Sequence, residues 1–360
     1  MEYMSAKEAA EKWGISQRRV AVLCSENRVE EATMVGNMWI IPKNAKKPVD
    51  ARSLRYFDFS DITVKPFLKW AGGKGQLIKE IEAYYPFDKL KEINKYAEPF
   101  VGGGAVLFDI LSKYNLKEVY ISDINEELIN TYCTIRDDVE ELIKLLSTYQ
   151  DAYLPLDSER RKEYYLKKRQ RFNDLKIKVN KQSNIERASL MIFLNKTCFN
   201  GLYRVNRKGL FNVPMGSYKN PCICDSDNLK NVSNKLQKVK IVCGDYREAK
   251  DFVDENTFVY FDPPYRPLND SSSFTAYTEN LFNDENQVEL AKFVSELDEK
   301  GARIVVSNSD PKNTNEDDDF FDKIYSNQII KRVDATRMIN SKASERGKIK
   351  ELLISNFEIL

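Results

Sequence analysis

A strand, a glycine-rich turn and the start of a helix are predicted in succession by Tyr96-Ala97-Glu98-Pro99-Phe100-Val101-Gly102-Gly103-Gly104-Ala105-Val106-Leu107-Phe108. Glycines at such a turn let a nucleotide-like ligand approach the backbone closely. The next predicted strand, Val119–Asp123, ends in a carboxylate about 25 residues beyond Glu98. That separation is near the one at which, in nucleotide-binding folds, an acidic residue accepts hydrogen bonds from the ribose hydroxyls. Strands and helices alternate from here on, which indicates an α/β sheet.

The composition is that of a globular chain with room for two or three domains: 360 residues, 42% hydrophobic and 31% charged. No apolar run approaches the roughly 18 residues of a membrane span, and the N-terminus lacks a signal-peptide pattern. We therefore expect a cytoplasmic protein without a membrane partner. Histidine is absent, which excludes His-based triads, His metal sites and His proton relays. We expect free cysteine thiols and no metal.

The net charge of +1 conceals a strongly basic segment. Residues 150–235 contain 18 Lys and Arg against 8 Asp and Glu, whereas residues 1–55 contain 10 against 7. A basic segment inside a nearly neutral chain favours a local face that binds a polyanion. For Arg160 to Arg171 taken alone, a solvated helix face is the alternative.

A small module precedes the α/β pattern. Ser5 and Glu8 form a capping-box pattern that opens a helix ending at Gly14. Ser16 begins a second helix, and residues 32–41 are predicted to form a hairpin with a two-residue turn. Two helices across a tight turn, followed by a hairpin, resemble the winged DNA-binding modules of excisionase and MerR-type regulators.

That resemblance assigns the start of the recognition helix, facing a DNA groove, to Gln17, Arg18 and Arg19. A protein-docking module of the same shape remains the alternative. The charged, proline-containing stretch from Lys43 to about Asp61 is predicted to be a linker.

The most specific motif follows the apolar strand Thr257–Phe261, which runs directly into Asp262-Pro263-Pro264-Tyr265. Two prolines fix φ and remove two backbone donors, so the turn is rigid and its carbonyls face other partners. A carboxylate, free carbonyls and an aromatic ring suit the exocyclic amine of a flat base. Asp262 and the carbonyl of Asp262 or Pro263 accept the amine hydrogens, and Tyr265 stacks on the base. A purely structural turn at a strand end is the alternative.

Several motifs, in the same order along the chain, resemble the Dam-type DNA adenine-N6 methyltransferases of the alpha group. The resemblance covers about residues 65–356 and includes a catalytic motif at Asp262 to Tyr265. The other matching segments are the opening cofactor motif Pro66 to Gly75, the methionine-binding loop Glu98 to Gly104, the DNA-reading segments Phe199 to Asn206 and Phe211 to Tyr218, and the base-side loop Phe274 to Tyr277.

The resemblance implies S-adenosylmethionine as cofactor. It places in the cofactor site Trp70, Lys74, Glu98, Phe100, Gly102, Asp123, Asp245 and Asp262. It assigns DNA contacts to Lys69, Arg204, Pro214 and Tyr218, with Arg204 suited to guanine O6 and N7. The alternatives are that Trp70 belongs to the core, that Lys74 is a solvated charge and that Asp123 or Asp245 caps a helix.

The expected architecture is a Rossmann-like methyltransferase sheet with an inserted, mainly helical target-recognition domain and a small N-terminal winged helix-turn-helix. The expected domains are a DNA-binding module (1–55), two methyltransferase parts (56–149 and 236–360) and the target-recognition domain (150–235). The implied reaction is site-specific methyl transfer to N6 of adenine, within GATC in duplex DNA, by base flipping and direct in-line attack. A restriction–modification system is the implied setting. The sequence leaves open whether an endonuclease is paired with the protein, whether single- or double-stranded DNA is preferred, what the N-terminal module binds and what the oligomeric state is.

Three other functions are consistent with parts of the pattern. A methyltransferase acting on RNA or on protein amides would also use a Pro-Pro-aromatic turn. A DNA-binding regulator with an inactive methyltransferase domain would keep the N-terminal module. A nicotinamide enzyme is the weakest alternative, because Gly102-Gly103-Gly104 is not the dinucleotide fingerprint.

Overall fold

The computed structural model describes residues 3–14, 16–25, 29, 32–36, 38–43, 45, 63–70, 72–177, 183–266, 282–336 and 348–359. The chain divides into two compact units, Met1–Phe59 and Ser60–Leu360. Each unit is described by itself. Among the described residues, no helix combines the length and the apolar character that a bilayer crossing requires.

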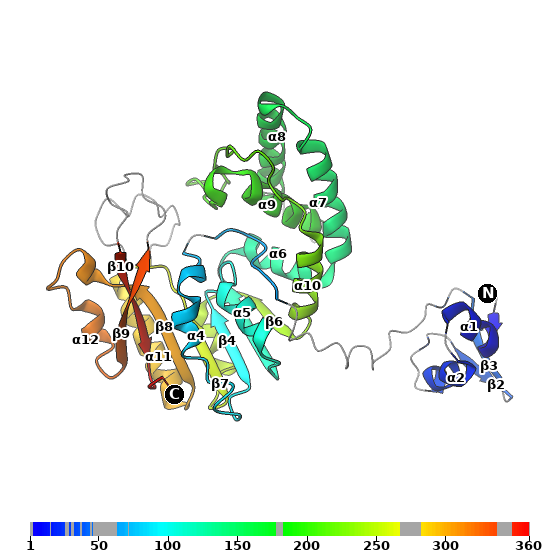
Figure 1. Cartoon of the computed structure of the whole chain (residues 1–360), viewed down its shortest axis with the longest axis horizontal. Coiled ribbons are helices and arrows are strands. Elements are labelled where there is room, and N and C mark those ends of the chain that lie inside the picture. Colours follow the sequence, from blue (N-terminus) through cyan, green and yellow to red (C-terminus); the bar gives the residue numbers. More distant parts are fainter. Residues whose placement is uncertain are drawn as a thin grey trace. The chain divides into compact units, whose positions relative to one another are not determined.

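The first unit packs two short helices against a three-stranded antiparallel sheet of order β1-β3-β2 (Figure 1). Its elements are β1 (Tyr3–Ser5), α1 (Ala6–Trp13), α2 (Gln17–Ser25), β2 (Thr33–Val35) and β3 (Met38–Pro42). The Ser5–Glu8 capping box predicted from the sequence is present, and Gly14 ends α1 in the left-handed conformation. The predicted helices and hairpin are therefore confirmed as elements. Strand β1 was not predicted, because three residues carry too little periodicity to reveal a strand.

The second unit is built on a sheet whose described strands follow the order β6-β5-β4-β7-β8-β10-β9. The strands are β4 (Lys95–Pro99), β5 (Glu118–Asp123), β6 (Val239–Cys243), β7 (Thr257–Phe261), β8 (Arg303–Ser309), β9 (Ile329–Thr336) and β10 (Lys348–Ser355). Strands β6, β5, β4, β7 and β8 are parallel, and β10 is antiparallel to both β8 and β9. The unit is thus a mixed α/β fold around a mostly parallel sheet, which confirms the predicted fold class at that level.

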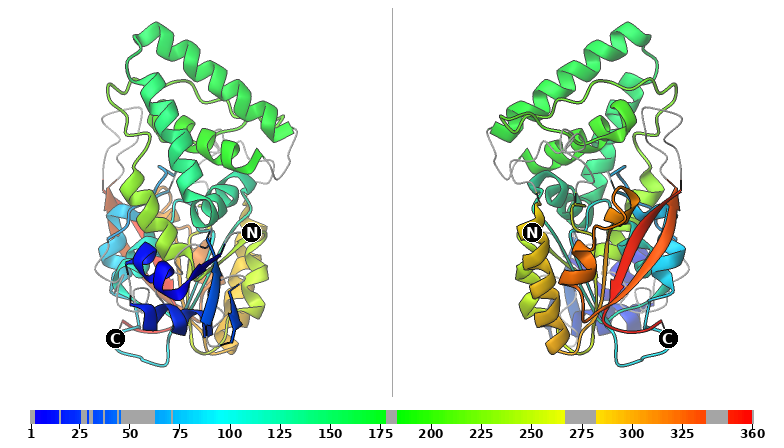
Figure 2. Two further views of the ribbon diagram at one scale, coloured as in Figure 1. Left: turned by 90° about the vertical axis from the view of Figure 1, so that its right-hand side faces the viewer. Right: turned by 90° about the vertical axis from the view of Figure 1, so that its left-hand side faces the viewer.

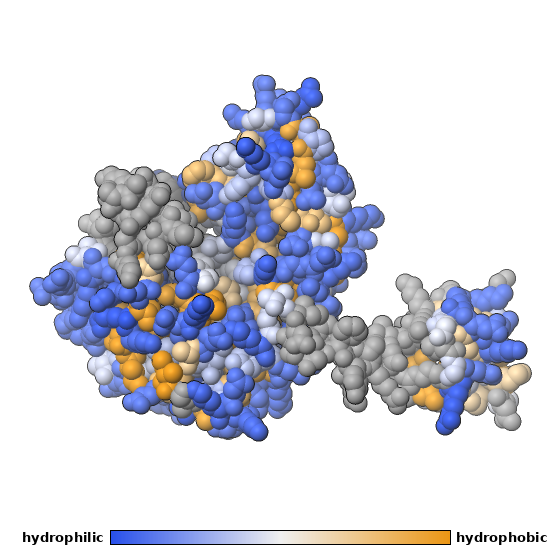
Figure 3. Space-filling view, viewed as in Figure 1, coloured by the Kyte–Doolittle hydropathy of each residue, from blue (hydrophilic) through white to orange (hydrophobic). Residues whose placement is uncertain are grey.

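Both faces of this sheet are covered. Neighbouring residues such as Tyr96 and Ala97, or Phe258 and Val259, alternate between two separate hydrophobic clusters. A strand points successive side chains to opposite faces, so the two clusters are the two cores on either side of the sheet. The face seen in Figure 3 carries mainly hydrophilic side chains around this interior.

The helices that cover the first face are α4 (Ile78–Glu82), α5 (Ala105–Lys113), α6 (Glu126–Asp137) and α10 (Ser226–Leu236). The second face is covered by α11 (Asp284–Glu299) and α12 (Phe320–Ile324). Beyond one end of the sheet lie α7 (Val139–Tyr153), α8 (Ser158–Ile177) and α9 (Asn184–Thr197) (Figures 1 and 2). The domain boundary expected between residues 149 and 150 falls inside α7.

A buried ion pair connects this helical part to the sheet. Arg187 on α9 donates to both carboxylate oxygens of Glu127 on α6, at 2.6 and 3.2 Å. Both side chains are only 4% exposed. A fork-shaped guanidinium facing a carboxylate fixes the geometry of two helices as well as their distance. The end of α9, from which the predicted DNA-reading segments start, is therefore set relative to the sheet.

Candidate functional site

The strand order reverses between β4 and β7. From β4 the chain continues through β5 to β6 on one side, and from β7 it continues to β8 on the other. In open parallel sheets such a switch point leaves a crevice at the carboxyl ends of the strands, where ligands bind. The loop after Pro99 and the turn at Asp262 leave the sheet here from adjacent strands.

The loop after β4 is shaped by backbone constraints. Gly102 and Gly104 have φ values of 49° and 71°, and Phe100 adopts φ 75° although it carries a side chain. A Cβ atom on Gly102 would lie 2.9 Å from Cδ1 of Trp70. A glycine is therefore required there for two reasons, the left-handed conformation and the close approach of the indole. This cradle is the feature expected where a nucleotide-like ligand meets the backbone.

Asp123 ties this loop to the end of β5. One carboxylate oxygen accepts a hydrogen bond from the Gly102 amide at 3.1 Å, and the other accepts from the Asn125 amide at 2.9 Å. Burial raises the pKa of Asp123, against these stabilising hydrogen bonds. Each carboxylate oxygen has a second lone pair, so the anchoring role leaves room for a ribose hydroxyl.

Glu98 lies inside the protein, 2% exposed, at the end of β4. The Tyr96 hydroxyl donates to its carboxylate at 2.7 Å. Burial raises the pKa of Glu98 to about 8, and the nearby Asp262 carboxylate contributes in the same direction. The site thus contains an acid that can hold a proton near neutral pH.

The catalytic motif predicted from the sequence is centred on an ion pair. Nζ of Lys74 lies 2.7 Å from Oδ1 of Asp262, and the lysine side chain is only 5% exposed. The Ser307 hydroxyl donates to the same oxygen at 3.0 Å. The alternative that Lys74 is a solvated charge is therefore wrong: it is a buried partner of Asp262.

Tyr265 lies beside this pair. Nζ of Lys74 is 4.5 Å from the centroid of its ring, and its hydroxyl donates to Glu351 at 2.7 Å. Burial raises the pKa of Tyr265 well above its ordinary value, so the phenol stays neutral. One face of the ring is thus covered by a cation while the hydroxyl is held at β10.

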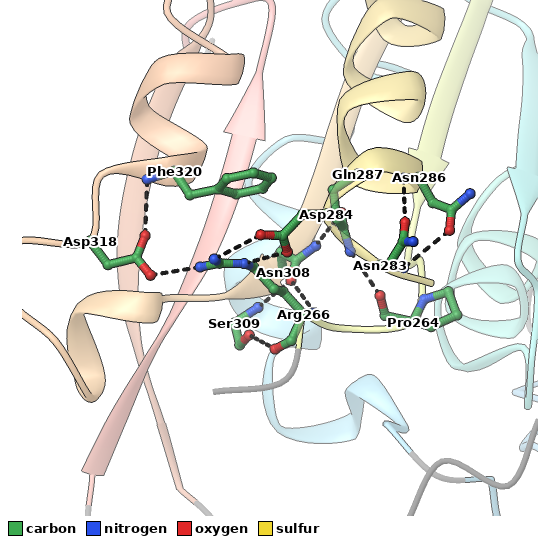
Figure 4. A network of polar contacts seen from close by, with 10 residues as sticks. All are labelled: Pro264, Arg266, Asn283, Asp284, Asn286, Gln287, Asn308, Ser309, Asp318 and Phe320. Atoms are coloured by element: carbon green, nitrogen blue, oxygen red, sulfur yellow. Dashed lines mark hydrogen bonds and ion pairs between the residues drawn. The ribbon is translucent and has the colours of Figure 1, made fainter. Parts of the chain in front are cut away.

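The two prolines behave differently from each other. Pro263 is buried, Pro264 is exposed, and the Pro264 carbonyl accepts a hydrogen bond from the side-chain amide of Gln287 at 3.0 Å (Figure 4). The sequence predicted that the carbonyls of this turn face other partners. For Pro264 that partner is the protein itself, which leaves the carbonyls of Asp262 and Pro263 as acceptors for a substrate amine.

Asp245 has the helix-capping role that was considered as its alternative. It caps the short 3₁₀ helix Tyr246–Asp251 and forms an ion pair with Arg247 at 2.7 Å. The neighbouring Tyr246 stacks on Phe100, with ring centroids 5.2 Å apart. Asp245 therefore caps a helix whose first residue packs on the loop after β4.

The predicted DNA-reading segments face each other across two isolated antiparallel bridges, Cys198–Met215 and Val205–Phe211. We call residues 198–218 the recognition hairpin. Arg204 is exposed on it and donates to the Asn212 side chain at 2.8 Å, and Pro214 is also exposed.

The recognition hairpin and the first cofactor motif are in contact. Lys69 donates to the Tyr218 hydroxyl at 3.2 Å, and Trp70 stacks on Tyr203 with centroids 5.5 Å apart. Asn195 bonds the backbone of Lys69 at both its N–H and its carbonyl, at 2.9 and 2.8 Å. Trp70 is thus half-buried between the glycine loop and the hairpin.

Some sequence expectations lie outside the described residues. These are the Phe274 to Tyr277 loop and the side chain of Arg19; Arg18 is exposed on α2. Within the part of the chain that the structure describes, no group of three or more metal-ligating side chains comes together. Burial raises the pKa of the Cys198 thiol to about 11, so it stays protonated at neutral pH.

Sequence reasoning missed several residues that hold the catalytic turn: Ser307, Asn308, Gln287 and Arg266. For Ser307 and Asn308 a signal existed, since Ser307-Asn308-Ser309-Asp310 follows the apolar run of β8. Polar residues at the carboxyl end of a buried parallel strand are candidates for the ligand crevice. Gln287 gave no such signal, because one amide in a polar helix looks like any surface residue.

Comparison with known proteins identifies the chain. A family model described as D12 class N6 adenine-specific DNA methyltransferase matches residues 70–339. The chain is 54% identical over 299 residues to the Type II methyltransferase M.MjaIII of Methanocaldococcus jannaschii, a match covering 82% of this chain and 100% of that protein. It is 39% identical to the Type II methyltransferase M1.LlaDCHI of Lactococcus lactis subsp. cremoris (82% and 96% covered) and 33% identical to the DNA adenine methylase of Escherichia coli K12 (80% and 94% covered). The chain therefore belongs to the D12 class of N6 adenine-specific DNA methyltransferases.

Proposed function

We propose that the protein transfers the methyl group of S-adenosylmethionine to N6 of adenine within GATC in duplex DNA. The observation that carries this proposal is the Lys74–Asp262 ion pair at the switch point of the sheet, one strand from the glycine loop. A rigid carboxylate beside a nucleotide cradle is the arrangement that methylation of a base amine requires.

The cofactor site we propose is lined by Trp70, Lys74, Glu98, Phe100, Gly102, Asp123, Asp245 and Asp262. The glycine loop fits such a group. Gly102 and Gly104 adopt left-handed conformations, and the Trp70 indole lies so close to Gly102 that a side chain there would collide with it. Asp123 retains acceptor capacity for the ribose. When bound, S-adenosylmethionine supplies an electrophilic methyl group on a sulfonium.

The catalytic role we propose for Asp262 follows from the weak nucleophilicity of the adenine amine, whose lone pair is delocalised into the ring. Among the described residues, the side-chain partners of the carboxylate, Lys74 and Ser307, both contact Oδ1. Oδ2 is therefore the oxygen that we propose to accept one N6–H, and the carbonyl of Asp262 or Pro263 accepts the other. Two acceptors favour a pyramidal nitrogen whose lone pair faces the methyl group.

Orientation supplies much of the remaining rate acceleration in an in-line transfer. The target adenine must leave the duplex to reach the crevice, and we propose that it stacks on Tyr265. The Lys74 ammonium covers one face of that ring, so the base takes the other. No histidine or thiolate is needed for this chemistry.

We propose that residues 150–235 form the target-recognition domain, inserted between the two methyltransferase parts 56–149 and 236–360. The segment is basic, with 18 Lys and Arg against 8 Asp and Glu, as phosphate contacts require. Lys69, Arg204, Pro214 and Tyr218 are the proposed DNA contacts, and Arg204 reads a guanine in the major groove.

Residues 1–55 are proposed to be a winged helix-turn-helix that binds DNA separately, with Arg18 and Arg19 at the start of its recognition helix. The matching family model begins at residue 70, so this unit is an addition to the family's common part. Two of the relatives are named Type II methyltransferases, which supports a restriction–modification setting with an endonuclease partner.

The test is protection of plasmid DNA. After incubation with the protein and S-adenosylmethionine, the plasmid is exposed to a nuclease that cuts GATC only when its adenine is unmethylated. We expect protection by the full chain and by residues 56–360, whereas Asp262→Ala should slow methylation at least about 100-fold, since it removes one acceptor of the developing charge.

Each other outcome overturns a defined part of the proposal. Methyl incorporation into DNA without protection would reject GATC but keep the reaction. Incorporation into RNA or protein alone would reject the DNA substrate. Unchanged activity of Asp262→Ala would reject the catalytic role of that carboxylate.

A further inference from the structure

The catalytic turn, residues 262–266, is held from outside by a buried pair of amides (Figure 4). Nε2 of Gln287, on α11, donates to the Pro264 carbonyl at 3.0 Å. Oε1 of the same side chain accepts from Nδ2 of Asn308, on β8, at 3.1 Å. Gln287 is 0% and Asn308 1% exposed, so water does not substitute for these contacts.

Asn308 extends the chain of hydrogen bonds to the other side of Tyr265. Its Oδ1 accepts from the Ser309 amide at 2.9 Å and from the Arg266 amide at 3.4 Å. The two amides therefore bond the Pro264 carbonyl and the Arg266 N–H, the backbone groups on either side of Tyr265. The position of the Tyr265 ring is therefore fixed through the backbone on either side of it.

Arg266 adds a third attachment. It forms ion pairs with Asp284 at 2.7 Å and with Asp318 at 2.6 Å, and its guanidinium lies 4.4 Å from the centroid of the Phe320 ring. The Ser309 hydroxyl donates to the Arg266 carbonyl at 3.3 Å. The end of the turn is thus bound to α11, to β8 and to the segment before α12.

An amide satisfies the middle of this network in its ordinary neutral form. Gln287 must donate at one end and accept at the other, which neither an ionised carboxylate nor an apolar side chain can do. A buried carbonyl that loses its donor costs free energy, and the turn would relax to recover one. Because Pro263 and Pro264 have no N–H, the backbone itself offers few alternative bonds.

We propose that Gln287 and Asn308 are positioning residues for methyl transfer, which hold Asp262 and Tyr265 in the orientation that receives the extruded adenine. The inference rests on the proposed function of the catalytic turn. The hydrogen bonds of the two side-chain amides go to each other and to the backbone of Pro264, Arg266 and Ser309. Their loss should therefore slow the chemical step without weakening cofactor binding.

The experiment compares variants of the full chain in which one amide becomes a carboxylate of the same size. When the new carboxyl is ionised, Gln287→Glu removes the donor to Pro264 and Asn308→Asp removes the donor to Gln287. The matched control is Asn286→Asp, one residue from Gln287 on α11: Asn286 bonds Asn283 through its Oδ1, which the substitution keeps. Gln287→Met serves as an uncharged version in case a buried carboxylate prevents folding.

For each variant we would measure the melting temperature, the single-turnover rate at saturating DNA and S-adenosylmethionine, and the Kd of each. We expect rates about 10- to 100-fold lower for the Gln287 and Asn308 variants, since a displacement of about 1 Å can cost that much. The two Kd values should change less than about threefold, and Asn286→Asp should match the wild type.

Wild-type rates in folded Gln287→Met and Asn308→Asp would overturn the inference while leaving the methyltransferase function intact. An equal loss of rate in Asn286→Asp would also overturn it, because the effect would then belong to α11 in general. If the wild-type chain itself methylates no adenine in DNA, the proposed function fails instead.

Discussion

The catalytic turn and the recognition hairpin are built in opposite ways. Asp262 is held by a buried lysine and a serine, and the turn after it is fastened by buried amides and two ion pairs. On the recognition hairpin, Arg204 is exposed and its partner Asn212 lies on the same hairpin.

The difference fits the two tasks that we propose for these segments. Directing a weak nucleophile requires acceptors that are already in place, because reorganisation during the reaction adds to the barrier. Reading a base edge requires donors that can exchange one partner for another on contact, so they must be reachable from solvent. Rigid burial suits the first task and local, exposed bonding suits the second.

The largest expected effect concerns the support beneath the hairpin. Arg187→Met leaves Glu127 buried without its partner, so we expect the free energy of unfolding to fall by about 3–5 kcal/mol. Urea denaturation measures this change. A loss of that size would sharpen the comparison, since the helix that leads into the exposed hairpin would then depend on a buried ion pair, as Asp262 does.

The control is the double variant Arg187→Met with Glu127→Leu, in which no charge is left buried. Much of the lost stability should return, because apolar replacement of a whole buried pair is often nearly neutral. If the double variant is as unstable as the single one, the cause is packing and the pair is not the support that we describe.

A smaller effect is expected from Arg204→Ala. The variant lacks the proposed bidentate contact to guanine. We therefore expect the difference in binding free energy between the cognate site and a site without that guanine to shrink by about 1–3 kcal/mol. Competition between two duplexes measures it. The matched control is Arg207→Ala, because Arg207 is also exposed on the hairpin. Equal losses in both variants would break the assignment of base reading to Arg204.

The last expected effect is a pH dependence of stability at Glu98, beside the catalytic turn. Its pKa of about 8 in the folded protein exceeds the value of 4.5 in the unfolded chain, so the folded state binds the extra proton between these values. Stability should therefore fall as the pH rises from about 4.5 to about 8, by up to about 1.4 kcal/mol per pH unit.

Glu98→Gln should flatten this pH dependence, as measured by urea denaturation at several pH values. Asp109→Asn is the control at another acid of the same unit, whose side chain is 20% exposed. An unchanged slope in Glu98→Gln would mean that Glu98 ionises in the folded protein as it does in the unfolded chain.

Local patterns along the chain predicted a large part of the molecule. The strand, glycine turn and helix around Glu98, the strand before Asp262 and the capping box at Ser5 all appear as expected. These features depend on residues a few positions apart, such as Ser5 and Glu8, whose hydrogen bonds form within one helical turn. Strand β1 escaped prediction because it is only three residues long and pairs with a strand more than 30 residues away. The bond from Gln287 to Pro264 escaped prediction because its two partners lie 23 residues apart.

The sequence by itself determined the mixed α/β fold class, the glycine-rich loop after Pro99 and the absence of histidine chemistry, and it gave the prediction of a catalytic motif at Asp262 to Tyr265. Only the tertiary structure decided that Lys74 is the buried partner of Asp262 and that Gln287 holds Pro264. The reason is that backbone propensity acts over a few residues, whereas burial and hydrogen bonding between distant segments depend on how the whole sheet is assembled. The partners of Asp262 and Pro264 can therefore be identified only from the assembled sheet.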